Sequence, residues 1–288
     1  MRSAVAIFLV GMGILLSLPQ WSGAQWVQGG SPGGGWITAL AATETNLFAG
    51  TVGHGVFLST DNGTSWTAVN SGLPANCSVF RLAVSGTNLF AVAGAERASV
   101  FLSTDNGTSW TAANTGLPDS EVLCLAVIGT NLFAGTGTPF SDKAGGVFLS
   151  IDNGASWRAV NSGLPKNAVI LRLTEIGTNL FAGTWAEGRV FMSTNNGANW
   201  TAASSGLPDP IDFSLSDLAV SGTNLFLGSF KGVFLSTDSG SSWTAINAGL
   251  PAGNSVYCLA VSGTNLYAGT EEGKVWRLPL SDLSLKKK

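Results

Sequence analysis

The chain has 288 residues, with 14 Lys and Arg against 17 Asp and Glu, a formal net charge of −3, and 38 glycines. A balance this close to neutral, without a basic stripe, argues against nucleic acid as a partner, and the acidic excess is too small to indicate a cationic one. The glycines suit a fold that turns every few residues. Because repeats cover most of the length, we expect a single domain over residues 25–280, followed by a solvated basic tail at 281–288 that ends in Lys286-Lys287-Lys288.

Residues 1–24 have the features of a cleaved signal peptide. Arg2 supplies a positive charge, and Ala4–Leu18 is an uncharged apolar run of 15 residues. Ser22-Gly23-Ala24 offers small residues for cleavage, so the mature chain is predicted to begin at Gln25. Fifteen residues fall short of the roughly 20 that span a membrane, which argues against a membrane anchor. The sequence therefore predicts a secreted or periplasmic, cell-envelope protein that contacts the membrane only through its signal.

One phrase of eight residues occurs five times along the rest of the chain. It reads STDNGTSW at Ser59–Trp66 and Ser103–Trp110, SIDNGASW at Ser150–Trp157, STNNGANW at Ser193–Trp200 and STDSGSSW at Ser236–Trp243. Its third residue recurs after 44, 47, 43 and 43 residues. A period of this length that carries short alternating strands is typical of a β-propeller blade.

Each unit is predicted to form four strands, as the second unit illustrates. Strand A covers Val79–Val84 on the inside, and strand B covers Leu89–Ala93. Strand C runs from Val100 into Ser103, and strand D covers Ser109–Ala113. The Asn-Gly pair between strands C and D is a strong hairpin signal.

The sixth unit is incomplete, and the two ends of the chain complement each other. This unit begins at Val256 and stops after its third strand, Lys274–Leu278. The segment Gln25–Pro32 matches the Ser65–Pro74 pattern with a small offset, and Trp26 takes the place of the tryptophan of the phrase. We therefore predict an all-β, six-bladed β-propeller of four-stranded antiparallel blades, with the last blade closed by the N-terminal strand.

The repeated phrase resembles the Asp-box, S/T-x-D-x-G-x-T/S-W, of sialidases, sortilin-type receptors, some xyloglucan-active glycosidases and photosystem II assembly factors. The resemblance covers about five of the six units and implies a propeller whose boxes lie on the face away from any active site. From the residues themselves, we expect the carboxylate to accept backbone N–H bonds across its turn, the glycine to take a positive φ, and the tryptophan to fill the gap between neighbouring sheets. The structural box residues are Asp61, Asp105, Asp152, Asn195 and Asp238, with Trp66, Trp110, Trp157, Trp200 and Trp243.

No metal or cofactor is expected at the boxes, although their Asp-Asn-Gly sequence is similar to part of a calcium loop. The spacing lacks the D-x-D-x-D-G run and the distal Glu that such a loop needs. In the fourth box Asn195 replaces Asp, and an amide keeps the acceptor but loses the charge. This replacement indicates hydrogen bonding rather than metal ligation.

The three cysteines are expected to be buried free thiols in a monomer. An odd number leaves at least one thiol unpaired. Cys124 and Cys258 occupy equivalent positions three units apart, on opposite sides of a six-bladed ring and too far apart to bond. The third is Cys77. A catalytic cysteine would need a histidine partner, and the only histidine, His54, lies in an unrelated loop.

The units differ most in their B–C loops and D–A connections, which project from the end of a propeller opposite the boxes. Loops carry function more often than scaffold does, so we expect a glycan or protein ligand at this loop end. The alternative is that the sequences of these surface loops diverge only because nothing constrains them. The candidate ligand-binding residues in these loops are Trp185, Arg189 and Phe213.

A sharper signal lies in strand A. The residues before its shared leucine are, in chain order, Ala39, Arg81, Cys124, Arg172, Asp217 and Cys258. Innermost strands line the axis of a propeller, so these side chains are expected to face or flank the central channel. Arg81, Arg172 and Asp217 could hold a carboxylate or a sugar acid. The alternative is an internal Arg–Asp network that satisfies itself.

Three function classes stay open, and we favour the first, a non-catalytic glycan- or protein-binding or scaffold module. The second is a sialidase-like glycoside hydrolase, for which the resemblance implies an arginine triad, a Tyr–Glu nucleophile pair and an Asp acid/base. Its candidates are Arg81 and Arg172 with Arg97 or Arg189, Tyr257 with Glu121 or Glu175, or, for an inverting enzyme, Asp217 with Asp212 or Glu121. The F/Y-R-I-P motif of that family is absent. The third class is an assembly factor similar to the photosystem group, although that family's basic patch is not visible.

Overall fold

The computed structural model describes residues 30–33, 36–43, 45–139, 141, 143–185, 188–208, 215–251, 253, 255–271 and 274–286. These residues form an all-β fold in which the 3-10 helix η2 (Leu280–Lys286) follows the last strand. Within this part of the chain, no helix combines the length and the apolar character needed to cross a membrane. The predicted signal at 1–24 lies outside the described residues.

Five sheets have four antiparallel strands in chain order, and the sixth has three strands within the described residues. The first is β1 (Ile37–Ala42), β2 (Leu47–Thr51), β3 (Gly55–Ser59) and β4 (Thr67–Ala68), and the second is β5 (Ser78–Ser85), β6 (Asn88–Gly94), β7 (Ser99–Ser103) and β8 (Thr111–Ala112). The third is β9 (Val122–Ile128), β10 (Asn131–Thr136), β11 (Gly146–Ser150) and β12 (Arg158–Ala159), and the fourth is β13 (Ile170–Ile176), β14 (Asn179–Thr184), β15 (Val190–Ser193) and β16 (Thr201–Ala202). The fifth is β17 (Leu215–Ser221), β18 (Asn224–Ser229), β19 (Gly232–Ser236) and β20 (Thr244–Ala245), and the sixth is β21 (Val256–Ser262), β22 (Asn265–Thr270) and β23 (Val275–Pro279).

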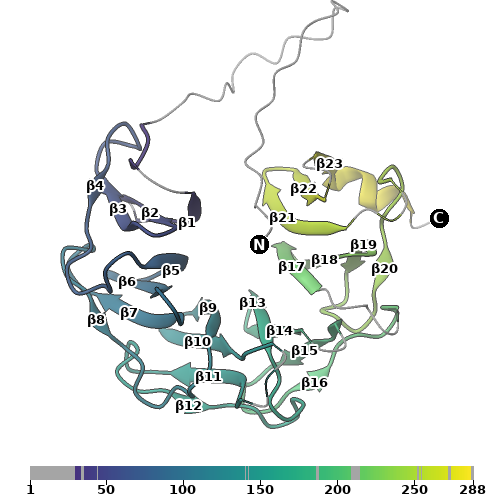
Figure 1. The fold of residues 1–288 in the computed structure, drawn as a ribbon. Helices are drawn as coiled ribbons and strands as arrows, with labels where there is room; N and C mark the ends of the chain where they lie inside the picture. Colours follow the sequence, from purple (N-terminus) through teal and green to yellow (C-terminus); the bar gives the residue numbers. More distant parts are fainter. Residues whose placement is uncertain are drawn as a thin grey trace, which may run out of the picture.

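The sheets follow one another along an arc, as a β-propeller requires (Figure 1). The first strand of each sheet lies on the inside of the arc and the short fourth strand on the outside, which confirms the predicted place of strand A. The first and last sheets flank an opening in the arc, so a closed ring is not seen. The predicted closing strand at residues 25–29 lies outside the described residues, and the count of six blades therefore stays a prediction.

The core lies between neighbouring sheets. The phenylalanine that directly follows the shared leucine of strand B is fully buried in five sheets: Phe48, Phe90, Phe133, Phe181 and Phe226. Phe90 of β6, for example, packs with Leu132 and Phe148 of the next sheet. Each sheet therefore buries its apolar side chains against the following one, which explains why one repeated pattern serves every unit.

The C-terminal segment is more firmly attached than predicted. Leu280 and Leu283 of η2 pack against the core cluster that contains Phe226 and Val256. The packed part of the chain therefore includes Leu283, beyond the domain end expected at residue 280, because this side chain finds apolar partners on the last sheets.

Candidate functional site

Each repeated turn is held together by its own carboxylate. The backbone N–H and the hydroxyl of Ser65 donate to Oδ1 and Oδ2 of Asp61 at 2.8 and 2.6 Å, and the Ser59 hydroxyl donates to Oδ1 at 2.8 Å. These hydrogen bonds lower the pKa of Asp61 to about 2. In the fourth turn, Oδ1 of Asn195 accepts the backbone N–H of Asn199 at 2.9 Å. The predicted hydrogen-bonding role is thus confirmed for both residue types.

The glycine of the turn takes a positive φ, as predicted, and so does the residue before it. In the first turn φ is 56° at Asn62 and 84° at Gly63. Asn is among the few non-glycine residues that adopt this conformation readily, which explains its place in four of the five turns. The left-handed conformation of this second residue was not predicted from the sequence.

The tryptophans bridge neighbouring sheets, as predicted. Four buried indoles donate to a carbonyl of the preceding unit at 2.7–2.8 Å: Trp110 to Val69, Trp157 to Ala113, Trp200 to Val160 and Trp243 to Ala203. Trp66, which is only half-buried, donates to Gly30 at 3.0 Å. The carboxylate, the glycine and the tryptophan of each turn all have structural roles. A binding or catalytic site is therefore to be expected in another part of the fold.

The innermost strands share a local irregularity at the positions that the sequence singled out. In every sheet the register shifts directly before Ala39, Arg81, Cys124, Arg172, Asp217 or Cys258. Such a bulge bends the strand and redirects side chains. Arg81 and Asp217 stand on β5 and β17, two of the first strands that lie on the inside of the arc (Figure 1).

One ion pair links two of these inner strands, β13 and β17. Nε of Arg172 donates to Oδ1 of Asp217 at 3.0 Å, with 28% and 20% of the side chains exposed. Oδ1 also accepts the N–H of Leu218 at 3.1 Å, and Oδ2 accepts the N–H of Leu259 at 2.9 Å. Both oxygens of Asp217 therefore have hydrogen-bond partners within the protein. The internal Arg–Asp network that was expected as an alternative is thus formed by Arg172 and Asp217.

Arg81 lies outside that ion pair. Its Nη1 donates to the carbonyl of Phe80 at 2.7 Å. Burial, and then the positive charge of Arg172, lower the pKa of Arg81. Cys124, on the strand between the two arginines, is buried, and burial raises the pKa of its thiol to about 11, so it contributes no negative charge.

The candidate hydrolase residues lie at different places on the arc. Tyr257, at the start of β21, is 47% exposed and packs edge-to-face on Phe230, with ring centroids 5.7 Å apart. Glu121 precedes β9, three sheets away. Glu175 stands four residues beyond the position of β13 equivalent to Tyr257, about 13 Å further along the strand toward the box end. The structure does not bring Tyr257 together with either carboxylate.

The loop candidates are only partly described. Trp185 follows β14 and its N–H donates to Val169 at 2.9 Å, and the carbonyl of Arg189 accepts the N–H of Thr184 at 2.9 Å. Phe213 and Asp212 lie outside the described residues. Arg97, proposed as a third arginine, forms an ion pair with Asp119, which also lies 3.6 Å from Nζ of Lys143. Sequence reasoning missed this pair, because its members come from a B–C loop and a D–A connection that no motif links.

The three cysteines are free thiols, as predicted, but one is not buried. Cys77 and Cys124 are buried, whereas Cys258 is exposed. Sγ of Cys124 lies 3.6 Å from the carbonyl of Ile170 on the next sheet. Cys258 stands on the last sheet, which no following sheet covers within the described residues, so the expectation of burial was wrong there. In the same part of the chain, no group of three or more His, Cys, Asp or Glu side chains is placed to hold a metal ion.

No protein-family model matches the chain, and no curated protein matches its sequence. Solved structures do match its fold. The GH74 xyloglucanase of Xanthomonas campestris is 19% identical with a TM-score of 0.66, over 88% of this chain and 45% of that one. The extracellular domain of BT4673, a putative one component system from B. thetaiotaomicron, is 15% identical with a TM-score of 0.64, over 88% and 35%. YCF48 bound to a D1 peptide is 14% identical with a TM-score of 0.61, over 84% and 78%.

These neighbours are β-propeller proteins, so the similarity shows the architecture. The chain spans less than half the length of the xyloglucanase and of the BT4673 domain. Because the neighbours include a glycoside hydrolase and a protein bound to a peptide, the fold alone does not choose between catalysis and binding.

Proposed function

We propose that this protein is an exported, non-catalytic binding or scaffold module that takes a glycan or protein ligand at its loop end and channel mouth. The observation that carries the proposal is the state of Asp217. Its two oxygens are occupied by Arg172 and by the N–H groups of Leu218 and Leu259. A carboxylate committed in this way is poorly suited to act as a nucleophile or general base, whereas the arginines beside it suit binding.

A glycoside hydrolase is the alternative, favoured by the GH74 structures among the neighbours. Glycosidases need two carboxyl groups about 5–10 Å apart across the scissile bond. Among the described residues, the charged side chains at the equivalent bulged positions of the inner strands are two arginines and one carboxylate, which does not meet that need. The third class is an assembly factor. This chain shares only its fold with YCF48, and its sequence offers no large basic patch of the kind expected for that class.

Hydrolysis and binding should be measured on the same mature protein. Incubation with a panel of fluorogenic glycosides, sialosides included, is expected to give no turnover from folded protein, while a glycan array and a peptide library give retained ligands. Turnover that disappears in an Arg81→Ala/Arg172→Ala variant would overturn the proposal and establish an enzyme.

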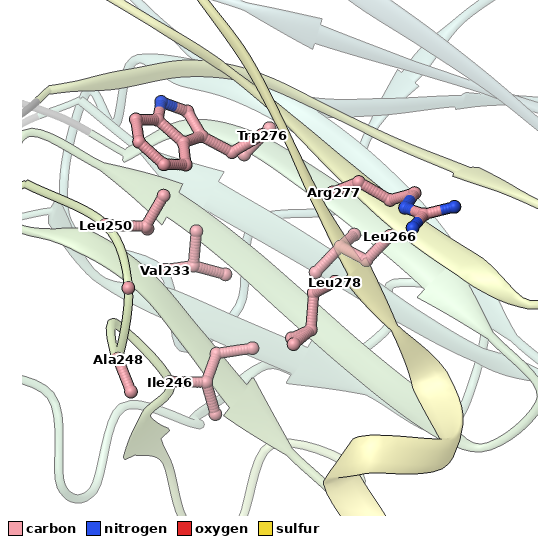
Figure 2. A pocket seen from close by; sticks show the side chains of 10 residues that line it. Val233, Ile246, Ala248, Leu250, Leu266, Trp276, Arg277 and Leu278 are labelled. Carbon is pink, nitrogen blue, oxygen red and sulfur yellow. The ribbon is translucent and has the colours of Figure 1, made fainter. Parts of the chain in front are cut away.

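We propose further that the ring has six blades and is closed by the N-terminal strand. A pocket of about 120 Å³ lies between the fifth and sixth sheets, with Val233, Ile246, Leu250 and Trp276 among the residues that line it (Figure 2). Ile246 is the equivalent of Val69, Ala113, Val160 and Ala203, whose carbonyls each accept an indole N–H. The pocket is thus the place where a sixth box tryptophan would pack.

Trp26 is the tryptophan available to fill this pocket. Its segment ends at Gly30, which is anchored on the first sheet through the carbonyl of Gly63 at 2.7 Å and the indole of Trp66 at 3.0 Å. The carbonyl of Gly30 therefore accepts the indole N–H of Trp66 in the same way that the carbonyl of Val69 accepts that of Trp110. The residues before Gly30 would then pair with the last sheet, and cleavage of the signal after Ala24 would leave this strand intact.

A further inference from the structure

We propose that Arg81, supported by Arg172, binds the carboxylate group of a ligand that enters the channel from the loop end. This inference rests on the proposed binding function and specifies the chemistry of the ligand. The two arginines occupy equivalent bulged positions on β5 and β13, and the strand between them, β9, carries the neutral Cys124 at that position.

Among the described residues, the charges at the equivalent bulged positions of the inner strands do not balance. Asp217 supplies one negative charge, and Arg81 and Arg172 supply two positive ones. The thiol of Cys124 stays neutral because burial raises its pKa. The equivalent position of β1 is Ala39, and that of β21 is Cys258, whose thiol pKa is also raised, by partial burial. Among the described residues at this level, one positive charge is therefore left over, and a monoanionic group would compensate it.

Arg81 has N–H donors that are available for a ligand. A guanidinium presents five N–H donors in a planar fork, and here one is directed to the carbonyl of Phe80. Arg172 directs Nε to Asp217 and Nη1 to the carbonyl of Leu171. A partly buried cation without a carboxylate is costly to keep, and a two-oxygen anion fits the fork of an arginine in a bidentate manner.

The surroundings of Arg81 indicate that the carboxylate belongs to a larger molecule. Phe80, the residue before it, is 41% exposed, although it is a large apolar side chain at the start of an inner strand. An exposed aromatic ring beside an arginine offers a flat apolar surface next to an anion site. This combination suits a sugar acid or the C-terminal residue of a peptide, which share the carboxylate.

The test uses matched pairs of probes on the mature protein. Glucuronate is compared with glucose, and a short peptide ending in a free carboxylate is compared with its C-terminal amide. Isothermal titration and thermal melting are the readouts, because a ligand that binds only the folded state raises Tm. We expect binding and a Tm increase with the acid of at least one pair and not with its neutral counterpart.

Arg81→Gln is the informative variant, and Arg158→Gln, at an exposed arginine of β12, is its control. Arg81→Gln should weaken binding of the acid at least tenfold and leave the free protein folded with an equal or higher Tm, since a buried charge is removed. Arg158→Gln should change neither property. Equal binding of acid and neutral probes, or unchanged affinity in Arg81→Gln, would overturn the inference.

Failure of this inference can be told apart from failure of the proposed function. Retention of neutral glycans or peptides at the loop end, independent of Arg81, would leave a binding module with a different ligand class. Hydrolysis of an acidic glycoside that needs Arg81 would instead keep the carboxylate site and overturn the non-catalytic function.

Discussion

Nε of Arg172 and Oδ1 of Asp217 lie 3.0 Å apart and join the inner strands of two neighbouring sheets, β13 and β17. Because Oδ2 of Asp217 also accepts the N–H of Leu259 on β21, one carboxylate connects three consecutive sheets. The same carboxylate offsets one of two arginine charges. Asp217 is thus a structural residue whose removal would affect both the packing of the arc and its charge.

We expect Asp217→Asn to be the most destabilising single change at this level of the channel. It leaves Arg172 without its carboxylate partner, and breaking a partly buried pair from one side costs about 1–3 kcal/mol. Arg172→Gln should cost less, because the two backbone N–H bonds to Asp217 remain. Urea unfolding of both single variants and the double variant gives the coupling, and strictly additive losses would show that the pair is not coupled.

The box carboxylates should make the protein sensitive to acid in a defined range. Hydrogen bonds, those from Ser65 and Ser156 first, hold the pKa values of Asp61 and Asp152 at about 2, below the value of about 3.9 for an unfolded chain. A depressed pKa adds stability above pH 4 that is lost as the pH falls from about 4 to about 2.

Exchanging the residue types of the boxes tests this origin. Asp61→Asn/Asp152→Asn should flatten the dependence of Tm on pH between 4 and 2, and Asn195→Asp should steepen it, because the fourth box would gain the same carboxylate. If the three proteins lose Tm in parallel over that range, the box carboxylates are not its source.

The repeat made the scaffold predictable, whereas the interactions of the charged inner-strand residues could be predicted only in part. Five copies of one phrase specify the turn, the buried tryptophan and the strand order, because each unit repeats the same local interactions. Arg81, Arg172 and Asp217 stood out since they vary at one repeated position. The sequence could not predict that Asp217 pairs with Arg172 rather than with Arg81. This pairing depends on the order of the sheets and on how far each side chain extends from its bulged position.

Thiol reactivity should separate Cys258 from the other two cysteines. In the native protein a disulfide reagent such as DTNB is expected to modify one thiol, since Cys77 and Cys124 are buried, and three after denaturation. The native reaction should accelerate as the pH rises, because partial burial of the thiol raises the pKa of Cys258 and the thiolate is the reactive form. Cys258→Ser should abolish it, and a persistent fast phase in that variant would place the exposed thiol elsewhere.

The proposed closure by the N-terminal strand allows a quantitative prediction for Trp26. If its indole fills the pocket beside Ile246, Trp26→Ala in the mature protein should lower the free energy of unfolding by about 3–5 kcal/mol, the cost of truncating a buried tryptophan. Trp243→Ala, which removes an indole that is 4% exposed and bonded to the carbonyl of Ala203 at 2.7 Å, is the positive reference. Trp36, 57% exposed, is the negative control, and its replacement by alanine should cost less than about 0.5 kcal/mol. Urea unfolding that ranks Trp26→Ala with Trp36→Ala would mean that the pocket between the fifth and sixth sheets is not filled by the N-terminal segment and that the ring closes in another way.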